Sequence, residues 1–465
     1  MNTSFRILAA AFAAVPFKSP ALHASSFTWD GGEPGSASWS AAANWAGNIA
    51  PPNNGTADLF FTGTAGLNPN ANPDWSIRSL MFGSGAGGFT IQGNALTIGA
   101  GGIANGDDSV QTIENDIVLA AAQTFRTTGT GSFAVNGNIN TGGNTLTVDA
   151  ATDFIVLGGA IAGSGALTSS GANSLVLTGG ESNTYTGGTT VSGSLTLAKT
   201  GGATAIPGAL IIGGGAGVSH VGIGFDEQIA NSSAVTVNAG ASLGLGAGVI
   251  ETVGALTIGG GAVQIGAGSL KVGSVAMTGG SISSTLAGRL ILGGNVTAAA
   301  GALIGGRIDL GGAARTFTVD GSAGSVQLEI PASIFNGSVI KTGAGTLRLS
   351  GAQTYASLLA QAGTVNLETA VGTGASTVTV APAAGSATVN FDASQRLASL
   401  TIGNGGVVNL NAQYLPSEIE SGALFSPDDG LAKLAESHGV PEPGALSLML
   451  AAASGWFLFR QRKQG

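Results

Sequence analysis

The chain has 465 residues, of which 43% are hydrophobic, 9% are charged and 80 are glycine. Its length exceeds the usual size of a single core, and abundant glycine together with abundant apolar residues excludes a disordered or collagen-like chain. The net charge of −9 and a pI near 4.7 disfavour nucleic acid as a partner, and the absence of cysteine excludes disulfides and thiol chemistry.

The N-terminus has the features of a secretory signal peptide. Arg6 precedes an apolar stretch over residues 7–17, and small residues stand near Ala21 and Ala24. We predict a signal peptide over residues 1–24, without choosing between cleavage at Ala21 and at Ala24. The alternative is a first helix that stays buried in the fold.

Residues 25–89 differ from the repetitive region after them because they concentrate large aromatic side chains, with Trp29, Trp39 and Trp45 close together. A solenoid must cover the open end of its first rung. We therefore predict that this region forms an N-terminal cap. In the alternative interpretation, Trp39 and Trp45 form a platform on which carbohydrate stacks.

Short alternating segments return throughout residues 90–410, each followed by Gly, Asn, Ser or Thr. Alternation with a period of two predicts half-buried strands. The linkers are too short for crossover helices, and glycine supplies the positive φ that sharp corners need. We predict an all-β parallel β-helix of about sixteen rungs, with roughly twenty residues and about 4.8 Å per rung. An antiparallel sandwich or propeller is the alternative, because strand spacing does not report strand direction.

Two segments of this region are internal copies of each other. Seven positions align: Leu175, Leu177, Gly179, Tyr185, Gly193, Leu195 and Leu197 with Leu347, Leu349, Gly351, Tyr355, Gly363, Val365 and Leu367. Recurrence of strands at an interval near twenty residues is typical of a solenoid.

The stretch from Asn183 to Leu197 and its partner from Gly343 to Tyr355 resemble the autotransporter-associated β-strand repeat. This resemblance implies a right-handed β-helix that is carried outside the cell. The second copy departs from the family pattern, because it reads TYASLLAQAG where the first has the Tyr-Thr-Gly-Gly-Thr-Thr core. The resemblance covers these two units firmly and much of residues 90–410 loosely.

Residues 411–439 are acidic and interrupted by proline, which predicts a linker. The one option for regular structure in it is a short helix over residues 431–436. His438 lies in this linker and is interpreted as solvated.

The end of the chain, residues 440–465, has three parts: a Pro-Glu-Pro motif, an apolar segment over residues 444–459 and a basic cluster. The residues of the motif and the cluster are Val440, Pro441, Glu442, Pro443, Arg460, Arg462 and Lys463. A helix of sixteen residues is roughly 24 Å long, which predicts a short transient anchor, and basic residues beyond it stay on the cytoplasmic side.

This tail resembles the PEP-CTERM sorting signal. The resemblance implies that exosortase, a membrane-embedded cysteine transpeptidase, recognises the tail and cleaves near Glu442, in Gram-negative bacteria that make extracellular polysaccharide. The alternative is an ordinary C-terminal anchor that is never cut.

Candidate catalytic residues are sparse. Polysaccharide lyases and hydrolases need clustered carboxylates, often with a basic residue or bound calcium. Three groups come closest: Asp107 with Asp108, Glu114 with Asp116, and His220 with Asp226 and Glu227. The first two are interpreted as solvated turn residues. The third is the best enzyme candidate, although it has no Arg or Lys beside it, and we assign no catalytic residue, cofactor or metal site.

Threonine rows on a flat β-helix face would suit binding to ice or another crystal. Motifs such as TLTV and TVTV point threonines outward, but they fail to repeat in successive rungs of the sequence, so we expect no such row.

The sequence thus predicts an exported, non-enzymatic β-helical protein with an N-terminal cap and a short C-terminal hydrophobic helix. We expect an inner-membrane-anchored precursor that is processed by exosortase and delivered by secretion machinery to the cell surface, outer envelope or extracellular matrix. Extracellular polysaccharide is the expected partner there. The alternative functions are a polysaccharide-active enzyme and a glycan-binding or adhesin module.

Overall fold

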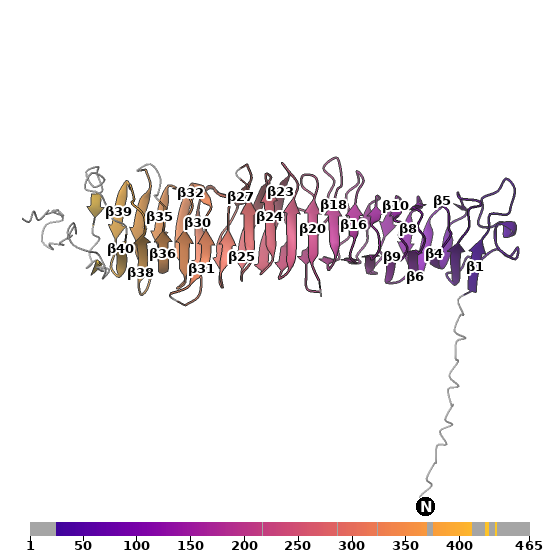
Figure 1. Cartoon of the computed structure of the whole chain (residues 1–465), viewed down its shortest axis with the longest axis horizontal. Coiled ribbons are helices and arrows are strands. Elements are labelled where there is room, and N and C mark those ends of the chain that lie inside the picture. The colour runs from indigo at the N-terminus through magenta and orange to yellow at the C-terminus, as the bar shows by residue number, and fades with distance from the viewer. Residues whose placement is uncertain are drawn as a thin grey trace, which may run out of the picture.

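A computed structural model describes residues 25–411 except 216, 286, 323 and 370–374, together with the strands Leu424–Ser426 and Lys433–Leu434. These residues form an elongated rod, with β1 (Ser25–Trp29) at one end and β40 (Gly406–Leu410) near the other (Figure 1). The predicted signal peptide and sorting tail lie outside the described residues.

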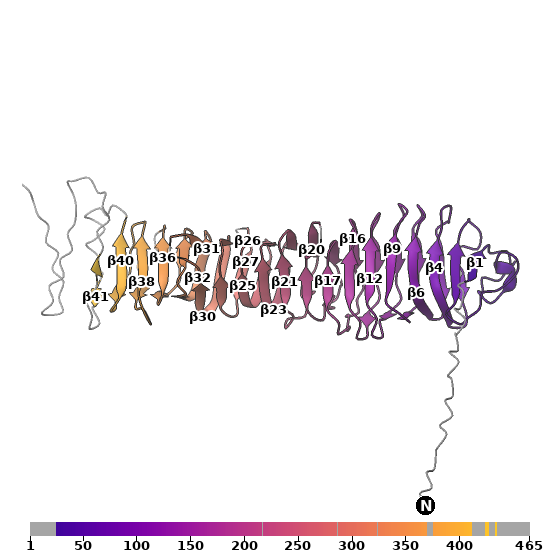
Figure 2. The same cartoon turned by 90° about the horizontal axis from the view of Figure 1, so that it is seen from below.

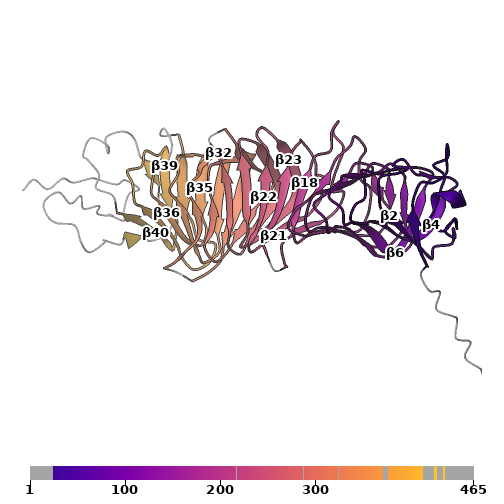
Figure 3. The same cartoon turned by 45° about the vertical axis from the view of Figure 1, so that its right-hand side comes forward.

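The rod is a parallel β-solenoid whose strands stack along its length (Figure 3). The strand pairs form three series, which we call the three faces, and in some turns a short connection replaces the strand of a face. Some strands bend around the corner between the first and second faces. These strands are β4 (Trp75–Phe82), β6 (Leu96–Asn105), β23 (Ile250–Gly259), β25 (Ser269–Met277), β30 (Arg307–Val319) and β32 (Ser333–Thr342).

The first face has the fewest strands of its own. They are β8 (Ile117–Leu119), β11 (Ile139–Asn140), β14 (Ile161–Ala162), β27 (Arg289–Leu292) and β34 (Gln353–Thr354).

The second face runs the whole length of the rod. Its own strands are β1, β2 (Ala57–Phe61), β9 (Gln123–Thr127), β12 (Leu146–Ala150), β15 (Leu167–Ser170), β17 (Thr189–Val191), β19 (Leu210–Ile212), β21 (Val235–Asn238), β28 (Val296–Ala298), β35 (Ser357–Ala360), β37 (Thr377–Val380), β39 (Ser399–Ile402) and β41 (Leu424–Ser426).

The third face is as long as the second. Its strands are β3 (Asn70–Ala71), β5 (Thr90–Gly93), β7 (Gln111–Ile113), β10 (Phe133–Val135), β13 (Ile155–Leu157), β16 (Ser174–Leu177), β18 (Ser194–Leu197), β20 (Ser219–Ile223), β22 (Ala241–Leu245), β24 (Ala262–Gly266), β26 (Ser281–Ser284), β29 (Ala302–Ile304), β31 (Val326–Ile330), β33 (Thr346–Leu349), β36 (Gly363–Leu367), β38 (Ala387–Phe391), β40 and β42 (Lys433–Leu434).

The pairs between these strands are all parallel in the part of the chain that the structure describes; for example β10 pairs with β13, and β13 with β16. The predicted parallel solenoid is therefore confirmed, with about 16 turns, and the antiparallel sandwich or propeller is wrong. Lys433–Leu434 pairs as a strand with β40, where we expected a short helix in the linker. The one helical element among the described residues is the short 3-10 helix η1 (Ala42–Asn44).

The core consists of columns of inward-pointing side chains. In β12 the buried side chains Leu146, Val148 and Ala150 alternate with half-buried Thr147 and Asp149, as a period of two requires. Parallel pairing in register places apolar residues of one turn on those of the next. Because each turn contacts only its neighbours, the apolar core grows with the number of turns.

The two internal copies occupy equivalent positions. Leu175 pairs with Leu195 as Leu347 pairs with Val365, and all four side chains are fully buried. The corner that follows β16 depends on glycine, because Gly179 has φ +89° and an added Cβ would lie 1.9 Å from the carbonyl oxygen of Gly158.

The N-terminal end of the core is aromatic. Trp29 and Trp45 meet edge to face with centroids 5.2 Å apart, and Trp39 lies 5.9 Å from Phe61 of β2. Because β1 pairs with β2 and β2 with β4, residues 25–89 already contribute strands to the solenoid. The tryptophans fill the interior of its first turns.

Candidate functional site

The best sequence-predicted enzyme group does not form a cluster that could hold a metal ion. His220 points outward from β20, where its Nδ1 lies 2.9 Å from the Ser242 hydroxyl. Asp226 accepts a hydrogen bond from the Ile250 N–H at 2.8 Å. Glu227 accepts one from the Thr252 hydroxyl at 3.0 Å. Among the described residues, no group of three or more His, Cys, Asp or Glu is placed to hold a metal ion.

The other two acidic pairs connect neighbouring turns. Asp108 accepts a hydrogen bond from the Thr130 hydroxyl at 2.7 Å, and Asp116 accepts one from the Asn138 N–H at 2.7 Å. Glu114 accepts one from the Asn136 side chain at 2.8 Å.

Asp107 is the most buried of these acids. It accepts backbone hydrogen bonds from Gly85 at 2.7 Å and Ser109 at 2.8 Å. Burial alone would raise the pKa of Asp107, but the hydrogen bonds from Ser109, Gly85 and Asp108 outweigh burial and lower it. Its carboxylate therefore acts as a fixed acceptor between turns.

The interior holds a polar group that sequence reasoning missed. Glu251 is fully buried and accepts backbone hydrogen bonds from Gln228 at 2.8 Å and Ile229 at 3.2 Å. Burial, with the nearby Glu227 carboxylate as a smaller cause, raises the pKa of Glu251 to about 8. A general acid needs such a pKa, but a side chain with no exposed surface cannot meet a polymeric substrate, so we interpret Glu251 as a structural group.

Lysine occurs inside the solenoid as well. Lys199 is fully buried, and its ammonium group donates to the carbonyls of Thr178 at 2.9 Å and Gly159 at 3.2 Å. Lys341 is equally buried and donates to the carbonyls of Thr342 and Gly343, each at 2.7 Å. Both lysines satisfy carbonyls at corners where the backbone leaves the ladder.

The tryptophans of the proposed sugar platform are not accessible. Trp39 and Trp45 have no exposed surface, and the indole N–H of Trp45 donates to the Trp39 carbonyl at 2.7 Å. Neither ring presents a face to solvent in this structure, so neither can stack on a sugar ring.

The outward side of the second face carries a column of threonines. In-register pairs join Thr124 to Thr147, Thr147 to Thr168 and Thr168 to Thr190. The column then continues through Ile211, Thr236, Thr257, Ala276, Thr297, Thr318 and Thr342. Our expectation that outward threonines do not repeat in successive turns is therefore wrong.

Unequal turn lengths hid this column in the sequence. The interval is 25 residues from Ile211 to Thr236 (236 − 211) but 19 from Thr257 to Ala276 (276 − 257). Corner loops of different length absorb the difference, so the strands pair in register although the number of residues per turn varies. Aligning each threonine by its buried neighbours, rather than by its spacing, would have found the column.

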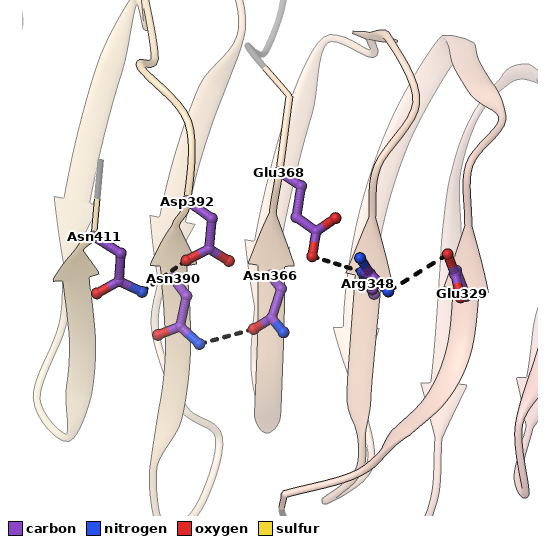
Figure 4. Close-up of polar contacts among 7 residues, drawn as sticks. All are labelled: Glu329, Arg348, Asn366, Glu368, Asn390, Asp392 and Asn411. Atoms are coloured by element: carbon purple, nitrogen blue, oxygen red, sulfur yellow. Dashed lines mark hydrogen bonds and ion pairs between the residues drawn. The ribbon is translucent and has the colours of Figure 1, made fainter. Parts of the chain in front are cut away.

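A second outward column lies at the C-terminal end of the third face (Figure 4). Its register is Glu329, Arg348, Asn366 and Asn390, which Figure 4 shows, followed by Asn409. The side-chain amide of Asn390 donates to Asn366 at 2.8 Å, and that of Asn409 donates to Asn390 at 2.7 Å. We call Asn366, Asn390 and Asn409 the amide ladder. It presents amide groups, whereas the threonine column presents hydroxyl and methyl groups.

Charged groups flank the amide ladder. The Arg348 guanidinium lies 2.6 Å from Glu368 and 3.6 Å from Glu329, and Asn411 donates to Asp392 at 2.7 Å (Figure 4). The hydrogen bond from Arg348 to Glu368, with their charges, raises the pKa of the guanidinium, which therefore stays protonated. Planar amides with carboxylates are groups that can hydrogen-bond sugar hydroxyls.

The comparisons with known proteins add no relative: no family model, no curated protein and no solved structure matches the chain. The two family resemblances therefore rest on the quoted sequence motifs alone. The sorting residues Val440 to Pro443, Arg460, Arg462 and Lys463 lie outside the described residues, as does His438. Within the described part, no helix has the length and apolarity to cross a bilayer.

Proposed function

We propose that this chain is an exported, non-enzymatic surface or matrix protein that works as a rigid rod. The observation that supports it most is the continuous parallel stack from β1 to β40 on one apolar interior. At about 4.8 Å per turn, a face of sixteen turns would be on the order of 80 Å long and could bind a ligand along this length. The proposal includes a right-handed coil, as the repeat resemblance implies.

The composition of the rod suits a scaffold outside the cell. Backbone ladders and apolar packing stabilise it without disulfides, and only 9% of the residues are charged. The outward columns are presented on rigid strands, which hold side chains in more regular positions than loops do. Such columns suit an extended ligand. For the amide ladder, the ligand that we propose is extracellular polysaccharide.

Export and sorting are supported by the two ends of the sequence. In the proposal, the signal peptide over residues 1–24 directs secretion, and the tail over residues 440–465 holds the precursor in the inner membrane as a short helix until exosortase cleaves near Glu442. The mature rod then reaches the cell surface, the outer envelope or the extracellular matrix.

Cell fractionation with mass spectrometry of the mature chain tests this proposal. We expect a C-terminus close to Glu442 in protein recovered outside the inner membrane. A variant with Pro441→Ala and Glu442→Ala should accumulate uncut in the inner membrane, whereas Ser447→Ala in the apolar segment serves as a control that is still processed. Full-length protein in the inner membrane of cells with active exosortase would contradict the processing step.

A further inference from the structure

The threonine column is the most regular outward feature of the rod. Its central part runs from Thr168 to Thr297 across β15, β17, β19, β21, β23, β25 and β28, which follow one another along the second face. Figure 2 labels β17, β21, β23 and β25 of this series along the rod. Thr190, Thr257 and Thr297 are exposed, and Thr168 is half-buried between buried Leu167 and Ser169. Each side chain therefore points away from the core.

The side chains on either side of this central part are short and uncharged. The two neighbouring outward columns contain small or amide side chains only: Ala166, Gly188, Ala209, Ala234, Ala255, Ser274 and Asn295 on one side, and Ser170, Ser192, Gly213, Asn238, Gly259, Thr278 and Ala299 on the other. The charged pair Arg126 and Asp149 lies before this stretch, and Asp320 lies after it. No aromatic ring occurs in these three columns between Thr168 and Thr297.

Threonine gives such a face two properties at once. Its β-branched side chain is stiff at χ1, so equivalent threonines in successive strands hold their methyl and hydroxyl groups in similar orientations. Parallel pairing repeats them about every 4.8 Å. Direct contact within the column occurs where the hydroxyls of Thr318 and Thr342 lie 2.9 Å apart. The result is a row of alternating hydrogen-bonding and apolar groups at one spacing.

The chemistry of this row restricts its ligand. The three columns carry no charged side chain between Thr168 and Thr297, so a neutral ligand complements them best. Single sugar rings are usually held by aromatic faces, and the three columns offer none. A ligand that engages many weak hydroxyl and methyl sites together must itself be periodic over several turns, because only then do the contacts act as one multivalent interaction.

Ordered water at the surface of ice meets these requirements: it is neutral, periodic and bonded through hydroxyl-like donors and acceptors. We propose that the threonine column from Thr168 to Thr297 is an ice-binding face. Ile211 and Ala276 interrupt the hydroxyls but keep the face apolar and uncharged, so they leave room for ordered water over methyl groups. This inference is independent of how the chain is sorted.

Partitioning of the purified full-length chain into slowly grown ice tests the proposal. We expect the wild-type chain to enter the ice fraction and to slow ice recrystallisation. An unrelated control protein at the same concentration should be excluded from the ice. The double variant Thr236→Lys with Thr257→Lys places two charges in the middle of the column. It should lose at least tenfold in ice partitioning.

The matched control carries the same substitutions on another face. Thr112 in β7 and Thr388 in β38 are half-buried outward threonines of the third face, so Thr112→Lys with Thr388→Lys should partition like the wild type. A milder variant, Thr236→Ala with Thr257→Ala, adds no bulk or charge and should lose severalfold. Circular dichroism and thermal unfolding of each variant verify that the solenoid is intact.

Several results would overturn the ice-binding face. Exclusion of the wild-type chain from ice would do so, as would equal loss in the third-face control or unchanged partitioning of the alanine variant. Retention on microcrystalline cellulose that disappears with the Thr236 and Thr257 substitutions, without any affinity for ice, would assign the face to a neutral polysaccharide instead. None of these results depends on cleavage near Glu442.

Discussion

The two internal copies share their apolar skeleton but differ in one buried hydroxyl. Tyr185 and Tyr355 occupy equivalent places, and each is almost fully buried. The Tyr185 hydroxyl lies 2.6 Å from the Thr189 hydroxyl, whereas that of Tyr355 has no hydrogen-bond partner. Four residues after Tyr355 the chain has Leu359, which offers no hydroxyl. Strand register therefore preserves the skeleton, while polar contacts depend on individual residue pairs.

Truncating the shared skeleton gives the largest expected effect. Leu177 and Leu349 are aligned and fully buried, so Leu177→Ala and Leu349→Ala should each destabilise the fold by about 2–5 kcal/mol. Because a solenoid is stabilised turn by turn, lost hydrogen-exchange protection should centre on the altered turn and its neighbours. Urea unfolding followed by hydrogen exchange measures both quantities. Similar losses of unfolding free energy in the two copies would support their equivalence. If one of the two variants were unaffected, the copies would not be equivalent.

Both regions also bury a lysine, which predicts a pH dependence. Burial lowers the pKa of Lys199 and of Lys341 to about 8, below the ordinary value of 10.5. The folded protein therefore binds fewer protons than the unfolded chain between these values. Stability should rise as the pH goes from about 8 to 10.5, by up to about 3 kcal/mol for each lysine, and this gain is lost as the pH falls back through 8.

Thermal unfolding from pH 8 to 10.5 measures this rise in stability. The double variant Lys199→Met with Lys341→Met should abolish it, because methionine keeps much of the side-chain length but does not titrate. Lys271 lies exposed on β25, so Lys271→Met is a control that should leave the rise in place. An unchanged rise in the double variant would show that other groups cause it.

The middle of the rod contains a fully buried carboxyl group, that of Glu251. Because burial raises the pKa of Glu251 from 4.5 to about 8, the folded state holds a proton that the unfolded chain releases. The resulting stability is fully present below pH 4.5 and is lost as the pH rises through 8. Glu251→Gln should flatten the stability profile in this window, and Glu329→Gln on the surface should not. Chemical unfolding at intervals across the window checks the slope.

The sequence predicted the fold because inward positions alternate strictly. Leu175, Leu177, Leu195 and Leu197 lie inside as the period-two pattern indicates, and parallel pairing then gives the solenoid. Alternation cannot identify inward polar residues such as Glu251, since a carboxylate at a buried position breaks the pattern. Glu251 can be buried because backbone N–H groups at a corner donate hydrogen bonds to its carboxyl group. Only the folded chain brings these N–H groups beside it.

The candidate surfaces were harder to predict than the core. Outward threonines are common in strands, so TLTV alone does not show that Thr147 and Thr168 are neighbours. The amide ladder from Asn366 to Asn409 was missed for the same reason, because each asparagine stands singly in the sequence. Trp39 and Trp45 differ, because composition left both a cap and a sugar platform open, and the burial of both rings rules out the platform.

The smallest expected effect returns to the two tyrosines. Tyr185→Phe removes the hydrogen bond to Thr189 and should destabilise the fold by about 1 kcal/mol. Tyr355→Phe removes a buried hydroxyl that has no partner, so it should leave stability unchanged or raise it by up to about 1 kcal/mol. Paired urea titrations at one pH would resolve this difference in sign. A loss of equal size in both variants would mean that Tyr355 makes a compensating contact, and the two copies would then be alike in their polar interior as well as in their skeleton.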